Sequence, residues 1–340
     1  MPSRSTCRRF RRLLRMGDWE GVRLHVVTGK GGTGKTTVAG ALAMALAAGG
    51  RRVLIAEVEE RQGLAQLFDV PPLAYQEQRV ASASGGGEVY ALAIDAREAM
   101  HEYLAMFYRL GRAGRALDKL GFVDFATTIA PGLRDVLLTG KAYEATRRRT
   151  GDHHAYDAIV LDAPPTGRIV RFLDVTTSVS SLARVGPINR QANSITDLIH
   201  SPRTAVHVVT LLEDMPVQET ADAVAELQAA HIPVGAVVVN QARPPHLATR
   251  SLPAARRGRL DHDDVLSGLR AAGLPATDAV VDVLTREAAD HAERTALEKT
   301  QRALVDDLGR PVYELPRIAD GIDPTALYEL AEALAEQGAV

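Results

Sequence analysis

Residues 29–36 read GKGGTGKT, and they directly follow the apolar run 22–28 (VRLHVVT). The residues after them place apolar side chains at helical spacing, with Val38, Leu42 and Leu46 on one side. The stretch fills every fixed position of the phosphate-binding pattern G-x-x-x-x-G-K-[ST]. Its glycines allow successive backbone N–H groups to point inward at a helix N-terminus, where an anion is favoured. The sequence therefore predicts a strand, a loop that binds nucleotide phosphates, and a helix.

Single residues of this loop have separate predicted roles. Lys35 is expected to reach the β- and γ-phosphates, and the Thr36 hydroxyl to ligate Mg²⁺. The other residues expected to contact the nucleotide are Gly29, Gly31, Gly32, Thr33, Gly34 and Thr37. Lys30 is a second lysine, at a position where an ordinary phosphate loop needs no cation. It is either a solvated loop residue or a residue with a function of its own.

The composition limits the class of protein. A net charge of −2 over 340 residues gives no bulk attraction to nucleic acid or to an anionic membrane. Cys7 is the single cysteine, which excludes a disulfide or a cysteine-based metal site within one chain. No apolar run approaches the ~20 residues that a membrane span needs. We therefore expect a cytoplasmic protein, with no nucleic-acid partner and no membrane contact.

Residues 1–20 are rich in arginine and lack the apolar core of a secretory signal. We expect a disordered tail, or an upstream extension of a chain that truly begins at Met16. The alternative is a short basic segment that touches membrane or nucleic acid.

Strand and helix patterns alternate along residues 21–340. Apolar runs predict strands at 22–28, 53–59, 88–95, 156–162, 204–212, 232–239 and 311–315. Residues 71–87 and 242–262 are rich in glycine or proline and are expected to be loops. Helical spacing over about 96–150 and 174–203 predicts an inserted helical subdomain, whose apolar side is either core or a groove for a client. The expected fold is a doubly wound α/β domain with a mainly parallel sheet of about seven to eight strands.

Asp162 ends the buried strand pattern 156–162. In a phosphate-loop protein, an acid at this place holds Mg²⁺ through water. The plainer alternative is a structural acid or a helix cap.

The loop with its second lysine resembles the deviant Walker A motif of dimeric nucleotide switches. These include the ParA/MinD partitioning ATPases, nitrogenase iron protein and the ArsA-like ATPases of arsenite pumps and tail-anchored-protein targeting. The resemblance implies that Lys30 crosses a dimer interface and contacts the nucleotide of the partner subunit. Residues 162–167 (DAPPTG) resemble the DTAPTGH switch of the ArsA-like family, which implies that Thr166 and Gly167 sense the γ-phosphate. Arg168 stands where that family has histidine.

Further matches favour the ArsA-like family and extend over nearly all of the chain from Val22 on. Residues 239–241 (VNQ) match the segment that reads adenine, which implies that ATP and ADP are the ligands, that Asn240 bonds the base edge and that Pro316 lies against the ring. Residues 217–220 (VQET) resemble the family's E-T helix.

The family motif S-T-D-P-A-H-N falls on residues 57–63. Gapless matching puts Glu59 at the aspartate that orients the attacking water, with Glu57 as the fallback. The proline and histidine of the motif are replaced by Glu60 and Gln62, which predicts slow or differently gated hydrolysis.

The sequence lacks several features that members of these families use to bind a metal, arsenite or a client protein. One cysteine cannot bridge an iron–sulfur cluster, form the thiolate site of arsenite activation or supply a C-x-x-C zinc clamp. Six scattered methionines do not make the Met-rich groove of the tail-anchored-protein chaperones. The first hypothesis is a Mg²⁺-dependent, ATP-hydrolysing dimeric switch that pairs with itself or a paralogue and acts on an unknown protein client. The alternatives are a ParA/MinD-like positioning ATPase that binds DNA or membrane, and a weakly active subunit of a heterodimer.

Overall fold

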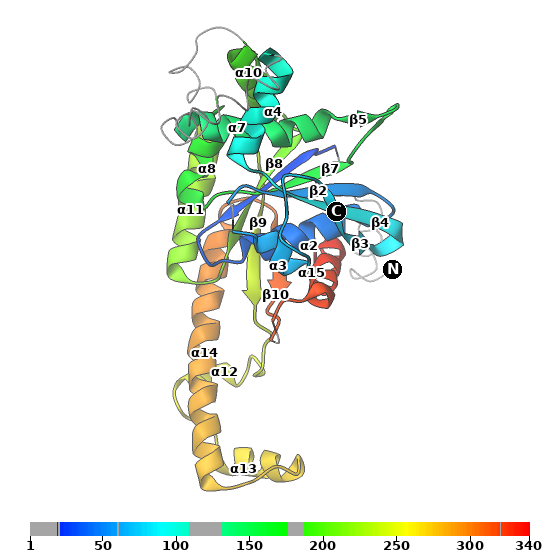
Figure 1. Cartoon of the computed structure of the whole chain (residues 1–340). Helices are drawn as coiled ribbons and strands as arrows, with labels where there is room; N and C mark the ends of the chain where they lie inside the picture. The colour runs from blue at the N-terminus through cyan, green and yellow to red at the C-terminus, as the bar shows by residue number, and fades with distance from the viewer. Residues whose placement is uncertain (1–18, 20, 60, 109–130, 176–186, 320) are drawn as a thin grey trace, which may run out of the picture.

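The computed structural model describes residues 19, 21–59, 61–108, 131–175, 187–319 and 321–340 (Figure 1). Among these residues, eight strands form one sheet in the order β10-β9-β8-β1-β7-β2-β4-β3. The strands are β1 Leu24–Gly29, β2 Arg52–Glu57, β3 Gln78–Ala83, β4 Gly87–Ala93, β7 Ala158–Asp162, β8 Thr204–Thr210, β9 Val234–Ala242 and β10 Val312–Pro316. β3 pairs antiparallel with β4, and the other neighbours pair in parallel. The expected mainly parallel sheet is confirmed.

Helices cover both faces of the sheet (Figure 1). One face packs against α2 Lys35–Ala47, α3 Gly63–Leu67 and α15 Pro324–Glu336, and the other against α7 Pro131–Arg147, α8 Thr166–Leu173, α10 Pro187–Ile199 and α11 Asp214–Ala229. Neighbouring residues of β1 show the alternation, since Val26 joins one buried cluster and Val27 the other. Strands buried on both faces are mostly apolar, which explains the apolar runs in their sequences. The doubly wound fold is confirmed.

Two stretches that were expected to be loops contain regular structure. Residues 71–87 were expected to be a loop, but Gln78–Ala83 form β3 at the edge of the sheet. Most β3 residues stay partly exposed, so the strand lacks the apolar run that marks a buried strand. The turn into β4 is the short 3₁₀ helix Ser84–Gly86. Within the second expected loop, Leu252–Arg256 form the short helix α12.

Helices α4 (Ala96–Tyr108), α7 and α10 gather at one end of the sheet, in the upper part of Figure 1. Side chains of α7 and α10 belong to the same buried cluster as β1 and β7, whereas α4 adds a small cluster around Met100 and Tyr103. The minor ribbon β5 Arg149–Thr150 and β6 His153–His154 follows α7. The expected subdomain also includes residues outside the described part, so its separate identity stays a prediction.

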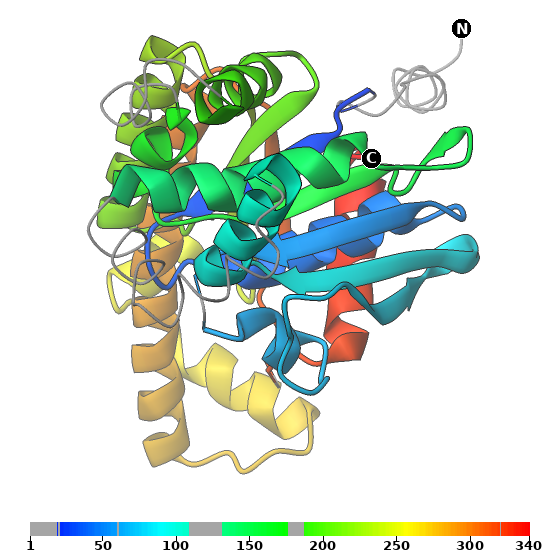
Figure 2. The same ribbon diagram turned by 45° about the horizontal axis from the view of Figure 1, so that its top comes forward.

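Helices α13 (His262–Ala271) and α14 (Asp278–Asp306) form an arm that extends away from the sheet (Figures 1 and 2). At its far end, Leu266 and Leu269 pack against the buried Val281. Near the sheet, the Gln301 amide donates to the Asp214 carboxylate on α11. No helix among the described residues combines the length and apolar character needed to cross a membrane.

The expected tail, residues 1–20, lies almost wholly outside the described residues. Its one described residue is Trp19, which is 7% exposed. The Trp19 ring lies 4.4 Å from the His207 ring and 5.7 Å from the His25 ring, measured between centroids. His25 and His207 are fully buried, and their rings are joined by a 3.1 Å Nδ1···Nε2 contact. Residue 19 is therefore part of the packed domain.

Candidate nucleotide site

The loop between β1 and α2 is closed by its own backbone. The carbonyl of Lys30 accepts the Thr33 hydroxyl at 2.8 Å and the Thr33 N–H at 3.3 Å. Gly34 has a φ of +83°, and a Cβ there would lie 2.3 Å from the Asn240 amide nitrogen. Glycine is therefore required at Gly34 by both backbone conformation and space. Gly31 and Gly32 are exposed at the tip of the loop, so their N–H groups are accessible to an anion.

The N-terminus of α2 lies directly after this loop. Lys35 is the first helical residue, followed by Thr36 and Thr37 in the first turn. All three are partly exposed, whereas Val38 and the residues after it are buried. The unpaired N–H groups of a helix N-terminus favour a phosphate at this place. The expected strand–loop–helix unit is present, and its open end holds the predicted phosphate-binding residues.

Asn240 joins the loop to strand β9. Its amide nitrogen donates to the Thr33 carbonyl at 2.9 Å, and its amide oxygen accepts from the Gln241 N–H at 2.9 Å. Both polar atoms of this 6% exposed side chain thus have protein partners. Pro316 pairs with Ala242 in the β10–β9 register, so it lies near the same strand end. The contacts of Asn240 and Pro316 with adenine stay predictions.

Asp162 lies at the end of β7, next to β1 and β2. The Thr36 hydroxyl donates to its Oδ2 at 2.6 Å, while its Oδ1 is buried without a hydrogen-bond partner among the described residues. Burial raises the pKa of Asp162 to about 6; Thr36 and the Lys35 charge oppose this, and the Glu57 and Glu59 carboxylates add to it. A cation at Oδ1 would satisfy this atom and favour the ionised form.

These residues fit magnesium. Mg²⁺ takes oxygen ligands and commonly uses one or two protein groups together with phosphates and water. The Thr36 hydroxyl and the Asp162 carboxylate supply such oxygens from neighbouring positions. No cluster of three histidine, cysteine or acidic side chains suited to a metal occurs in the described part of the chain. The donor set therefore favours a nucleotide-bound Mg²⁺ over a cation caged by protein alone.

Glu57 is a buried acid beside Asp162 that the sequence offered only as a fallback. The two residues are partners in the β2–β7 register, and Glu57 is 4% exposed. Its carboxylate accepts the N–H groups of Gln62 and Leu64, both at 3.0 Å, and so holds the start of α3. Glu59 lies two residues beyond the strand end and is partly exposed. Glu57 thus supports the loop that carries Glu59.

The predicted switch segment follows Asp162. The hydroxyl of Thr28, on β1, donates to the Pro164 carbonyl at 2.7 Å. Thr166 is buried as the first residue of α8, and the space beside Gly167 is open. Burial raises the pKa of Asp135 on α7, and the positive charge of Arg168 opposes that rise. The arginine that replaces the family's histidine thus acts electrostatically on α7.

Lys30 has a partner that the sequence did not reveal. Its Nζ lies 2.7 Å from Oε1 of Glu219 on α11. The two residues are far apart in the chain, and only the adjacency of β1 and β8 brings them together. The VQET match drew attention to this helix but carried no information about that contact.

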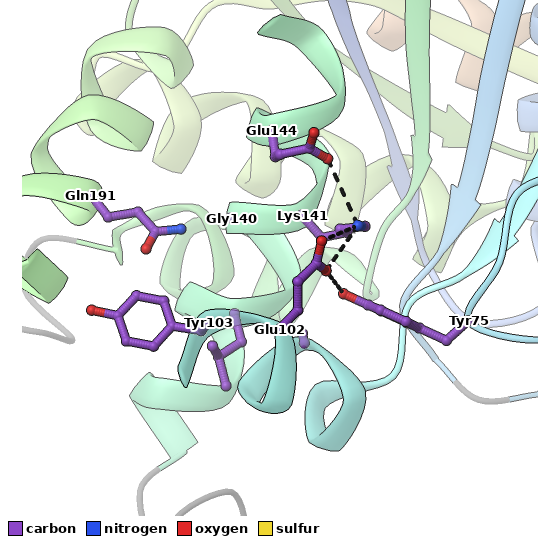
Figure 3. A pocket seen from close by; sticks show the side chains of 9 residues that line it. Tyr75, Glu102, Tyr103, Gly140, Lys141, Glu144 and Gln191 are labelled. Atoms are coloured by element: carbon purple, nitrogen blue, oxygen red, sulfur yellow. Dashed lines mark hydrogen bonds and ion pairs between the residues drawn. The ribbon is translucent and has the colours of Figure 1, made fainter. Parts of the chain in front are cut away.

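A second group of polar side chains ties the segment after α3 to the helices above the sheet (Figure 3). The Tyr75 hydroxyl donates to Glu102 on α4 at 2.6 Å, and the Lys141 ammonium on α7 lies 2.8 Å from the same carboxylate. Gln62 reaches this segment too, because its side chain bonds both the N–H and the carbonyl of Leu73. Hydrogen bonds therefore run from the loop beside Glu57 to α4 and α7.

Comparison with known proteins agrees with this site. Residues 22–199, just over half of the chain, match a family described as anion-transporting ATPase. The chain is 56% identical over 319 residues to the ATPase BagA of Mycobacterium tuberculosis strain H37Rv, and the match covers 94% of each protein. It is 26% identical over 360 residues to the arsenical pump-driving ATPase of Escherichia coli, covering 92% of this chain and 59% of that protein.

Proposed function

This chain belongs to the anion-transporting ATPase family, as its motifs predicted, and from this membership we propose that it is a Mg²⁺-dependent, ATP-hydrolysing dimeric switch. The observation that carries the proposal is the contact between Thr36 and Asp162 beside the phosphate loop. It leaves Oδ1 of Asp162 with no hydrogen-bond partner among the residues that the structure describes. Such a hydroxyl–carboxylate pair is the usual protein contribution to a nucleotide-bound magnesium. When bound, Mg²⁺ neutralises charge on the phosphates.

The chain's own residues then have defined parts. Backbone N–H groups of the loop and the Lys35 ammonium bind the phosphates. Glu59 orients the attacking water, and Thr166 and Gly167 respond to the γ-phosphate. Lys30 enters the site of the second subunit, where a cation stabilises the charge of the transition state.

The Lys30→Ala variant tests the dimeric mechanism, with Lys299→Ala as the control because Lys299 is an exposed lysine on α14, outside the phosphate loop. Loss of a cation supplied in trans lowers turnover by roughly 10³-fold or more where such groups have been dissected. We expect that loss for Lys30→Ala, together with loss of ATP-dependent dimerisation and near-normal ADP binding. Normal turnover by Lys30→Ala would contradict the role in trans.

The second subunit is this chain itself or a paralogue. Light scattering on the purified protein, with Mg²⁺ and a non-hydrolysable ATP analogue, separates these cases. A self-dimer that turns over ATP supports the homodimer; a monomer that gains activity only with a paralogue supports the heterodimer.

The output of the switch is a protein client. The Escherichia coli relative is named for an arsenical pump, but the single cysteine argues against a thiolate arsenite site here. Affinity capture with an Asp162→Asn variant and ATP, compared with ADP, tests for a client that binds one nucleotide state.

A further inference from the structure

Lys30 is already paired within its own subunit. Its ammonium lies 2.7 Å from the Glu219 carboxylate, and the two side chains are 31% and 36% exposed. The Lys30 carbonyl is held independently by Thr33, through both the hydroxyl and the N–H of that residue. The ion pair with Glu219 therefore sets where the ammonium lies, and it is not needed to close the loop.

Glu219, the partner of Lys30, lies on helix α11, which is packed firmly against the sheet. Val217, Val224 and Leu227 of α11 are buried against the sheet. Thr220, next to Glu219, is 1% exposed and donates to the Pro216 carbonyl at 2.8 Å. The Glu219 side chain contributes to none of these contacts. The helix is therefore fixed by its apolar face, and Glu219 can be altered without removing a buried group.

We propose that Glu219 is a positioning residue that retains Lys30 in the separate subunit and releases it when two ATP-bound subunits close. This inference rests on the proposed function. The polyphosphate of a partner's ATP carries several negative charges, so it competes for the ammonium more strongly than one exposed carboxylate does. Gly31 and Gly32 follow Lys30 and have no side chains to hinder its swing. On closure, the ion pair between Lys30 and Glu219 of the same subunit is thus replaced by one between Lys30 and the nucleotide of the second subunit.

The strength of the pair sets the size of the effect. An exposed ion pair typically changes an equilibrium by about two- to fivefold. A closed dimer breaks two such pairs, one in each subunit. The dimerisation constant should therefore rise on the order of tenfold when Glu219 no longer competes for Lys30.

The experiment compares Glu219→Gln with Glu226→Gln. Glu226 is exposed two turns further along α11, so its substitution makes the same charge change away from Lys30. Sedimentation over a range of protein concentrations, with Mg²⁺ and a non-hydrolysable ATP analogue, gives the dimerisation midpoint. We expect Glu219→Gln to dimerise at roughly tenfold lower concentration, and Glu226→Gln to match the wild type. An unchanged or higher midpoint for Glu219→Gln overturns the proposal.

A second measurement reports on Lys30 directly. An amine-acylating reagent is attacked by the neutral amine form of a lysine, and an ion pair with a carboxylate holds the lysine as ammonium and slows this reaction. Mass spectrometry resolves each of the chain's lysines. Without nucleotide, Lys30 should be acylated several-fold faster in Glu219→Gln than in the wild type or in Glu226→Gln. Equal rates would mean that Glu219 does not retain Lys30.

The Lys30→Ala variant distinguishes the two failures. If it loses ATP-dependent dimerisation while Glu219→Gln matches the wild type, the retention by Glu219 is wrong and the proposed function stands. If Lys30→Ala dimerises and turns over normally, the role in trans is itself wrong. If both variants behave as expected, the double variant Lys30→Ala/Glu219→Gln should dimerise no better than Lys30→Ala alone.

Discussion

The side-chain amide of Asn240 donates a 2.9 Å hydrogen bond to the carbonyl of Thr33, which joins strand β9 to the phosphate loop. The amide reaches the loop over Gly34, whose missing Cβ leaves the space that it occupies. The loop is thus held from outside its own strand–loop–helix unit. Any change at this strand end acts on the shape of the phosphate site.

We expect Asn240→Ala to weaken ADP binding by about five- to tenfold, because a lost hydrogen bond of this kind contributes about 1 kcal/mol. Isothermal titration calorimetry measures the change. Asn240→Asp should bind more weakly still, since its carboxylate would face the Thr33 carbonyl. Equal affinity for all three proteins would show that the loop keeps its shape without Asn240.

Two nearby acids have separable roles. Glu57→Gln should lower the free energy of unfolding by about 1–3 kcal/mol, because an amide cannot accept both backbone N–H groups at the start of α3. Glu59→Gln should leave stability nearly unchanged but lower turnover by roughly 10²-fold or more if it orients water. Urea unfolding and steady-state turnover, measured on both variants, test the assignment. Full turnover in Glu59→Gln would exclude Glu59 from orienting the water and leave Glu57 as the candidate.

The raised pKa of Asp162 predicts a pH-dependent stability. Burial raises its pKa from 3.8 to about 6, so the folded protein holds a proton between these values that the unfolded chain releases. As pH rises through this window the nucleotide-free protein loses stability, on the order of 3 kcal/mol by pH 7.

Asp162→Asn tests this directly. The variant keeps an acceptor for Thr36, so it should be more stable than the wild type at pH 7 and nearly equal at pH 4. It should also lose Mg²⁺-dependent turnover. Asp197→Asn, an exposed change on α10, is the control for general charge effects. If Asp162→Asn were less stable than the wild type at pH 7, the claim that the buried charge of Asp162 destabilises the folded protein would be wrong.

The buried histidine pair predicts loss of stability in acid. Burial lowers the pKa of His207 from 6.5 to about 3, so the unfolded chain binds a proton that the folded chain excludes. The contribution of neutral His207 to the free energy of unfolding is fully present above pH 6.5 and is lost as pH falls toward 3. His207→Gln should reduce this slope by about 1.4 kcal/mol per pH unit between pH 6 and 4. Urea midpoints across that range test it, with the exposed His153→Gln expected to keep the wild-type slope.

The sequence predicted those parts of the fold that depend on local pattern. The loop at 29–36 carries a motif, and the buried strand ending at Asp162 carries an apolar run within a few residues. β3 was missed because an edge strand is half-exposed and shows no such run. Local pattern suffices where a segment carries a mostly apolar run, as the opposite edge strand β10 does, and it fails at β3, where most side chains stay partly exposed.

The site was predicted less completely than the fold. Thr36 and Asp162 were expected to serve one cation, and the structure brings them within hydrogen-bond distance. The pairing of Lys30 with Glu219 and of Asn240 with Thr33 depends on strand order, which no short stretch of sequence contains. The sequence offered Glu57 only as a fallback, although it is an acid at the end of an apolar run, as Asp162 is.

The arm formed by α13 and α14 acts as a lever that enlarges small movements at the sheet. Helix α14 has 29 residues, so it is about 44 Å long at 1.5 Å per residue. Its sheet-proximal end is anchored through Gln301 to Asp214, at the start of the helix that also carries Glu219. The far end of α14 lies about 35 Å from Gln301, so a tilt of about 10° at this pivot would carry it through roughly 6 Å. A movement too small to disturb the core would thus become a large stroke at the tip.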